Sequence, residues 1–389
     1  MRFLHLADLH IGKRVNEFPM TGDQRHVLLQ VLRVMEDRKV DGVIIAGDVY
    51  DKAVPSAEAV GVLDWFLTEL AVRKMPVYLV SGNHDSGERL AFGAKLMRRS
   101  GIHVAGVYDG TLEPVRLEDE YGALYLYLLP FVKPAYVKKA MSEALQIAEK
   151  PEEEENIQTY QDAVSYVLSQ AKVEAGNRNL LVAHQLVTGA TRCESEEISV
   201  GGIDNVDASL FAPFDYVALG HLHGPQNVGG PAIRYCGSPL KYSFSEADQE
   251  KSVTVVTLQG KGNVEVSTVP LEPRRDLVEI RGSYMEVTAK EYYDNLDRDA
   301  YFHITLTDEE DITDGVRRLQ TVYPNLMKMD YDNARTRFRG DIEAEEEAAR
   351  SPMELFGKLY QAQNNRPLSE EQKTLLQEMI EKIWGGEEE

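Results

Sequence analysis

The sequence is short of cysteine, of long apolar runs and of basic side chains. Its two cysteines, Cys193 and Cys236, are far apart and form no CxxC pair, which argues against a disulfide framework and a zinc knuckle. No apolar run approaches the roughly 18 residues that span a bilayer, and the first residues lack the basic and apolar regions of a signal peptide. We therefore expect a soluble cytoplasmic protein with no membrane partner.

The shortage of positive charge bears on whether the chain binds a nucleic acid. The 42 Lys and Arg residues against 64 Asp and Glu give a formal net charge of −22, which opposes binding to a polyanion such as DNA. The acidic residues are unevenly placed, with one block at 149–155 and another excess in 341–389. Carboxylates that bind metal ions are neutralised in use, so the charge weakens the expectation of a nucleic-acid partner without excluding it.

Nearly continuous apolar runs recur in the first 225 residues, and such runs are typical of strands buried on both faces. Helical patterns separate several of them, at 24–37 and at 56–70, where Ser56 is the expected N-cap. The alternation predicts the α/β fold class, a layered β-sandwich with flanking helices. The five runs lie at 2–8, 41–48, 76–83, 179–184 and 215–221.

The two predicted helices should each bury one apolar stripe. In the first the stripe is Val27, Leu28, Val31, Leu32 and Met35, and in the second it is Val60, Leu63, Phe66, Leu67 and Leu70.

We expect three parts along the 389-residue chain. Residues 1–270 carry the five runs and end in strands without intervening helices. Residues 271–338 alternate strand, helix, strand, helix and strand, which predicts a small α+β capping domain. Residues 339–389 combine an acidic link with C-terminal helices.

The last helical stretch, 369–384, begins with Ser369 and Gln372 as a capping box and carries an apolar stripe from Leu375 to Trp384. Such a stripe either packs back on its own chain or docks on a partner. The acidic link before it favours docking, because it gives the helix reach.

Each of the five apolar runs ends in side chains that can bind a metal ion. In open α/β sheets the carboxyl ends of the strands share one edge, where ligands bind, so these side chains should converge on one crevice. One Asp-x-His pair is a weak signal, but a ligand after all five runs is a strong one. The residues are Asp8, His10, Asp48, Asn83, His84, Asp85, His184, His221 and His223.

The chemistry of this set predicts a two-ion centre. Mixed histidine, carboxylate and amide ligands suit Mn²⁺, Fe²⁺ or Zn²⁺ rather than an all-oxygen Mg²⁺ or Ca²⁺ site. Seven ligands are too many for one ion and fit two if one carboxylate bridges. Two ions about 3.5–4 Å apart can activate water and hold both oxygens of an in-line displacement at phosphorus. His84 can act on the phosphate or on the leaving oxygen, and Asp85 can orient His84 or cap the following helix.

The order D-x-H, GD, GNHD, H and GHxH resembles the calcineurin-like metallophosphoesterases. The segment 198–247, with GDVYDKAVPSAEA and LEPRRDLVEIRG, is similar to the SbcD family of bacterial nuclease subunits. Some relatives carry a further active-site histidine shortly after the GD motif, where this chain has Asp51. The resemblance implies that His84 is the catalytic histidine and that Mn²⁺ is the expected metal. It assigns Asp8, His10, Asp48 and His223 to one ion and Asp48, Asn83, His184 and His221 to the other.

The resemblance also implies a function. It predicts a two-metal-dependent DNA phosphodiesterase, an exonuclease and endonuclease that acts on double-strand ends and hairpins in DNA repair, recombination and replication at the nucleoid. Its partner would be an SbcC-type ATPase with a coiled coil, and the subunit would be a homodimer within a heterotetramer. Residues 271–338 would recognise DNA, and the C-terminal helices would dock the partner.

Two alternatives remain at this point. A phosphatase or cyclic-nucleotide phosphodiesterase could use the same site, although the long segment beyond the catalytic domain favours the nuclease. A scaffold with a purely structural metal site is disfavoured, because such a site needs no open positions for water and substrate.

The remaining histidines and one aromatic run are expected to be structural. Basic pairs are more often solvated surface than ligand contacts, but Lys13 and Arg14 have the best claim to a phosphate, because they follow the first ligand pair. The residues expected to be structural are His5, His26, His103, His303 and the strand at 121–130.

Overall fold

The computed structural model of the chain describes residues 1–145, 156–191 and 205–333, with isolated positions from Thr336 to Leu376. These residues form two compact units, the first made of 1–279 with 299–303 and the second of the residues between and after those ranges. The domain boundaries that the sequence indicated, after 270 and after 338, stay predictions.

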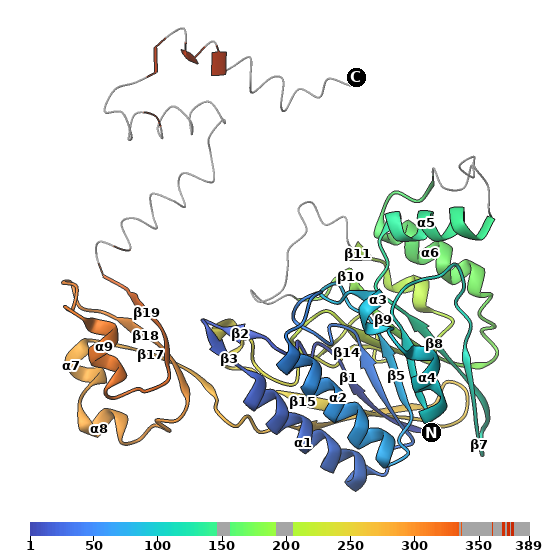
Figure 1. Cartoon of the computed structure of the whole chain (residues 1–389), viewed down its shortest axis with the longest axis horizontal. Helices are drawn as coiled ribbons and strands as arrows, with labels where there is room; N and C mark the ends of the chain where they lie inside the picture. Colours follow the sequence, from blue (N-terminus) through green and yellow to red (C-terminus); the bar gives the residue numbers. More distant parts are fainter. Residues whose placement is uncertain are drawn as a thin grey trace. The chain divides into compact units, whose positions relative to one another are not determined.

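Two six-stranded sheets form the first unit (Figure 1). The first sheet has the order β16-β15-β1-β4-β5-β6 and the second the order β13-β14-β12-β9-β8-β7. The strands of the first sheet are β1 (Arg2–Leu6), β4 (Gly42–Ala46), β5 (Val77–Val80), β6 (Ile102–Ala105), β15 (Ser252–Leu258) and β16 (Val264–Pro270). Those of the second are β7 (Val115–Asp119), β8 (Gly122–Leu129), β9 (Arg178–His184), β12 (Tyr216–Gly220), β13 (Gln226–Asn227) and β14 (Ile233–Tyr235).

All five apolar runs of the sequence are strands, but they belong to two sheets. The first three are β1, β4 and β5, which run parallel in one sheet, and the last two are β9 and β12, which run parallel in the other. Every residue of β4, β5, β9 and β12 is buried, as their continuous hydrophobicity indicates. The site therefore lies where the carboxyl ends of two sheets meet, which the α/β sandwich allows and a single sheet does not.

The layer between the sheets is apolar and tightly closed. Phe3, Tyr78 and Tyr216 from the two sheets belong to one cluster of buried side chains. His5 lies among them with its Nδ1 3.0 Å from the Tyr216 hydroxyl, and burial lowers the pKa of His5 to about 3. His5 is thus a packed neutral residue, as expected.

Helices cover the outer faces of both sheets. Helices α1 (Thr21–Arg38) and α2 (Ala57–Val72) pack on the first sheet, while α5 (Pro134–Leu145) and α6 (Tyr160–Ala171) pack on the second. The Ser56 hydroxyl accepts the Ala59 N–H at 3.2 Å, which confirms the predicted N-cap of α2. The short helices α3 (Gly87–Leu90) and α4 (Ala94–Met97) follow β5, and the short pairs β2 (Arg14–Val15) with β3 (Phe18–Pro19) and β10 (Leu186–Val187) with β11 (Asn205–Val206) lie in loops.

The predicted stripe of α1 is buried throughout, whereas that of α2 is partly wrong. Leu63, Phe66 and Leu70 are buried, but Val60 is 45% exposed. Ala59 and Val62 complete the buried face instead. A helix turns by about 100° per residue, so the apolar neighbours of Val60 define a face from which it points away.

The second unit contains β19 and the second halves of β17 and β18, which belong to a three-stranded sheet of order β17-β18-β19. Its Tyr323 hydroxyl donates to the Val287 carbonyl at 2.6 Å and ties two segments of the unit together. The predicted alternation of strands and helices is confirmed, but the helix expected at 288–296 is replaced by shorter turns of helix. The elements are β17 (Leu277–Gly282), α7 (Tyr284–Val287), α8 (Lys290–Tyr293), β18 (Tyr301–Leu306), α9 (Gly315–Gln320) and β19 (Leu326–Tyr331).

Little of the predicted C-terminal helix falls on described residues. Ser369 and Gln372 exchange two hydrogen bonds, of 3.0 and 3.2 Å, which confirms the capping box. Of the apolar stripe, Leu375 is described and exposed, and Trp384 lies outside the described residues. Among the helices that the structure describes, none is long and apolar enough to cross a bilayer.

Candidate metal centre

Tight turns after the strands carry the predicted ligands. The backbone after β1 continues to pair with the backbone after β4, because the Asp8 N–H donates to Gly47 at 3.0 Å and the His10 N–H to Asp48 at 2.9 Å. Positive φ angles occur at Asp8 (51°), His10 (41°), Asp48 (48°) and His221 (107°). Such angles are unfavourable for residues with a Cβ and collect at functional sites, where the surrounding structure holds them.

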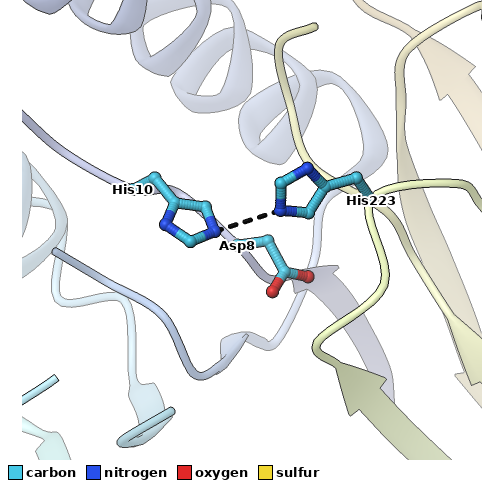
Figure 2. A group of neighbouring side chains, drawn as sticks. All are labelled: Asp8, His10 and His223. Atoms are coloured by element: carbon cyan, nitrogen blue, oxygen red, sulfur yellow. Dashed lines mark hydrogen bonds between the residues drawn. The ribbon is translucent and has the colours of Figure 1, made fainter. Parts of the chain in front are cut away.

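One group of ligands lies between β1 and β12. Figure 2 shows His10 and His223 facing each other beside the Asp8 carboxylate. The two Nε2 atoms are 3.1 Å apart, and a ligand atom of each of the three residues lies within 4.8 Å of the others. All three residues are at most 2% exposed.

A second group joins the ends of β5, β9 and β12. The side-chain oxygen of Asn83 is 3.0 Å from His184 Nε2 and 3.0 Å from His221 Nδ1. His184 is fully buried, whereas Asn83 and His221 are half-buried.

The Asp48 carboxylate stands between the two groups. Its Oδ2 lies 3.7 Å from His10 Nε2 and 3.4 Å from His184 Nε2. Burial opposes ionisation, but His184 and then His10 outweigh it and hold the pKa of Asp48 well below its usual range. Asp48 is therefore an anion in contact with both groups, which is the position a bridging ligand requires.

The donor set and its surroundings fit divalent cations. Among the described residues, Oδ2 of Asp8 is buried without a hydrogen-bond partner, which is costly for a carboxylate. Burial raises the pKa of Asp8 to about 7, and a bound cation would reverse that shift. A Cβ at Gly82 would overlap the Asp48 carboxylate, and one at Gly47 would overlap His184, so only glycine lets the backbone pass this close.

His84 and Asp85 have different surroundings. His84 donates its Nδ1–H to the Asp51 carbonyl at 3.1 Å, which leaves Nε2 4.0 Å from Asp48. The Asp85 carboxylate accepts three backbone N–H groups instead, from Val49, Tyr50 and Gly82, at 2.9 to 3.1 Å. Burial, and then Asp48, raises the pKa of Asp85 to about 6. The structure thus places Asp85 where it braces the Asp48 turn, and the carbonyl of Asp51 where it orients His84.

Comparisons with known proteins match this geometry to a family. The model of the calcineurin-like phosphoesterases matches residues 1–225, and that of the type 5 capsule protein repressor C-terminal domain matches residues 273–364. The SbcD subunit of the nuclease SbcCD of Staphylococcus epidermidis is 33% identical over 333 residues, which are 85% of each chain. The chain belongs to the SbcD family of calcineurin-like phosphoesterases.

Two solved structures of low sequence identity are also similar to the chain. A dimetal phosphatase from Danio rerio has 13% identity and a TM-score of 0.41, and covers 70% of this chain and 99% of its own. The protein TT1561 of Thermus thermophilus has 10% identity and a TM-score of 0.37, and covers 69% of this chain and 98% of its own.

As a member of the SbcD family, the chain is a metal-dependent phosphoesterase. The structure brings together all seven side chains that the sequence singled out as ligands. It also places Asp48 between the group that contains His10 and the group that contains His184. The division of the ligands between two ions stays a prediction.

Sequence reasoning missed the residues that support the ligands from behind. His223 donates its Nδ1–H to Glu246 at 3.2 Å, and the fully buried Glu246 pairs with Lys251 at 2.6 Å. Such a carboxylate fixes the histidine with Nε2 turned to the metal position. The Ala46 carbonyl does the same for His184 at 2.8 Å. Glu246 and Lys251 lie in a polar stretch that resembles an exposed loop, so no pattern could have identified them.

Proposed function

We propose that the chain is a two-metal-dependent DNA phosphodiesterase that acts on double-strand ends and hairpins together with an SbcC-type ATPase. The position of Asp48 carries the proposal, because its carboxylate contacts His10 on one side and His184 on the other. Membership of the SbcD family supports the choice of DNA as substrate. The proposal includes a homodimer within a heterotetramer that works in DNA repair, recombination and replication in the cytoplasm.

The ligand set would hold two divalent ions, with Mn²⁺ as the proposed metal. When bound, such ions supply Lewis-acid stabilisation of the phosphate and activation of water. The chain's own contribution begins with His84, whose imidazole is fixed by the Asp51 carbonyl. Because Nδ1 carries the proton of that hydrogen bond, Nε2 is the atom available to hold or release a proton. We assign His84 to donate that proton to the leaving oxygen.

Two carboxylates keep this arrangement in place. Asp85 holds the Asp48 turn through backbone N–H groups, and Asp48 accepts the His84 backbone N–H at 2.9 Å. The catalytic histidine and the proposed bridging carboxylate are thus fixed to one another through the main chain. Such rigidity maintains the sub-ångström positioning that in-line attack requires.

The proposal is tested with the purified chain, Mn²⁺ and four substrates, with and without the SbcC-type partner. The substrates are blunt duplex DNA, hairpin DNA, bis(4-nitrophenyl) phosphate and 4-nitrophenyl phosphate. We expect cleavage of DNA and of the diester, and acceleration on DNA by the partner with ATP. Cleavage of the monoester alone would indicate a phosphatase and overturn the proposal.

A further inference from the structure

A cavity of about 420 Å³ lies directly beside the metal centre. Its volume falls in the range of about 300–1,000 Å³ that small-molecule sites occupy. It is lined by Ala53 and by residues of three segments, namely 81–88, which runs into α3, 106–108, and 131–140, which runs into α5. Asn83 belongs both to this lining and to the ligand group that includes His184, so a molecule in the cavity abuts the metal centre.

The cavity presents aromatic rings and a cation next to that centre. The Phe131 ring lies edge-on to the His184 imidazole, with 6.1 Å between the ring centres. The Lys133 ammonium lies 5.7 Å from the centre of the Phe131 ring and 5.8 Å from that of Tyr136. Tyr136 is 47% exposed. Rings beside a cation suit a ligand that has both a flat apolar face and a phosphate.

The lining also supplies lysine side chains that can contact an anion. Lys133 and Lys139 line the cavity, and Glu88 opposes them. The Asp85 carboxylate is directed to backbone N–H groups. The lining thus sets two lysines against the carboxylates of Glu88 and Asp85, which makes it less acidic than the chain as a whole, with its net charge of −22.

We propose that this cavity is the nucleotide subsite of the enzyme. The base on one side of the scissile phosphate packs against Tyr136 and Phe131, and Lys133 contacts the next phosphate along the strand. A base can use the face of Tyr136 only when it is unstacked from its neighbour. The inference rests on the proposed function and deepens it, because it makes the reacting nucleotide an unpaired one, at a frayed end or in a hairpin loop.

The test uses the full chain with Mn²⁺ and three esters that each release 4-nitrophenolate. They are the 4-nitrophenyl esters of thymidine 5′-phosphate, thymidine 3′-phosphate and methyl phosphate, which differ in the presence and side of the nucleoside. In Tyr136→Ala, we expect KM for one thymidine ester to rise about tenfold relative to KM for the methyl ester, the scale of a lost base stack. Tyr136→Phe keeps the ring and should keep the KM ratio.

A matched control is Tyr121→Ala, because Tyr121 is 46% exposed and lies in the turn between β7 and β8. This variant should leave all three KM values unchanged. A second arm uses Lys133→Gln and compares a thymidine dinucleotide with and without an extra terminal phosphate. The unmodified chain should prefer the dinucleotide that bears the phosphate, and the variant should lose this preference several-fold. Circular dichroism and calorimetric Mn²⁺ binding verify that each variant is folded.

Unchanged KM ratios for both thymidine esters in Tyr136→Ala, with an unchanged phosphate preference in Lys133→Gln, overturn the subsite. That result differs from failure of the proposed function, in which the unmodified chain cleaves neither DNA nor any of the three diesters.

Discussion

The two ends of the metal centre are built differently. At the His10 end, Asp8, His10 and His223 are at most 2% exposed. At the His184 end, Asn83 and His221 are half-buried, and Asn83 opens on the cavity. A closed set of ligands retains an ion, whereas an open one leaves room for water and substrate. From this comparison we expect the first end to anchor the metal ions and the second to meet the substrate.

The support behind the ligands differs in the same way. Behind the His10 end, Gln24 donates to the His10 carbonyl at 2.7 Å and Glu246 accepts from His223. The buried Lys251 adds hydrogen bonds to Ser238 and to the His223 carbonyl, each of 3.0 Å. Behind the His184 end, the main chain supplies the contact, through the carbonyl of Ala46. Side-chain networks of this kind fix the orientation of a ligand but depend on every member being paired.

Asp48→Ala should erase the difference between the ends. Loss of the shared carboxylate leaves the ligand groups of both ends incomplete and leaves the repulsion between two cations uncompensated. We expect binding of both ions to weaken and kcat to fall by more than about 100-fold. Loss of a residue that only supports a ligand typically costs about 10- to 100-fold in metal affinity or activity. Calorimetric titration with Mn²⁺ and a diester assay measure the two effects. Retention of two tightly bound ions would show that Asp48 does not bridge.

His84→Gln should leave both metal ions bound and still greatly reduce turnover. His84 is 22% exposed at its side chain and contacts the site through its backbone N–H, which the variant keeps. Loss of a general acid costs about 10²- to 10⁴-fold in rate, and we expect kcat to fall in that range with a Mn²⁺ stoichiometry of two. A variant with two ions and near-normal cleavage would remove His84 from the mechanism.

Glu246→Ala should weaken one end selectively. Without the carboxylate, His223 is no longer oriented, so affinity for one of two ions should fall by about 10- to 100-fold while the other is kept. Because the variant leaves Lys251 buried without its carboxylate partner, the double variant Glu246→Ala with Lys251→Met separates orientation from folding. Calorimetric titration resolves the two sites. Glu118→Ala, at an exposed pair with Arg116, is the matched control, and equal weakening of both ions by the Glu246 variants would contradict the asymmetry.

The proximity of the side chains at both ends could be predicted from the sequence for one physical reason. Strands buried on both faces read as continuous apolar runs, so a polar residue at the end of a run is conspicuous. The pairs Asp8 with His10 and His221 with His223 marked the runs from β1 and β12 as metal-binding. The sequence could not tell that these strands belong to different sheets, because a buried strand reads the same in either.

The asymmetry between the ends could not be predicted from the sequence. The buried Glu246 and Lys251 neutralise one another, and a pair five residues apart leaves no periodic signal. The cavity at the other end is lined partly from turns, where side-chain direction depends on the backbone rather than on a repeat. Val60 shows the same limit inside a helix. Val60 and its neighbours Ala59 and Val62 are all apolar, and the sequence does not tell which of them face the sheet.

A pair remote from both ends provides a test of stability alone. Arg178 holds Asp119 with two hydrogen bonds of 2.6 and 2.9 Å, and these keep the pKa of Asp119 well below its usual range. Asp119→Asn should lower the free energy of unfolding by about 1 kcal/mol at neutral pH, a modest value because the pair is partly exposed. Binding of both ions should be unchanged.

The sign of the pH dependence follows from the depressed pKa of Asp119. The pair stabilises the fold fully above the unfolded pKa, about 3.9 for aspartate, and that stability is lost as the pH falls. In a chelator, the difference in free energy of unfolding between the unmodified chain and Asp119→Asn should therefore shrink below about pH 4. A difference that grows on acidification would contradict this.

The smallest expected effect concerns the basic pair beside the His10 end. Lys13 and Arg14 are equivalent in the sequence, but Lys13 pairs with Asp51 at 2.9 Å and Arg14 is exposed, with Glu17 3.7 Å away. Arg14 is therefore the residue better placed to neutralise a phosphate, while Lys13 already neutralises Asp51. We expect Arg14→Gln to weaken duplex binding a few-fold and to lower the slope of log affinity against log salt by about 1. Lys13→Gln should change the slope by less, and a larger change than that of Arg14→Gln would show that DNA displaces Asp51 from Lys13.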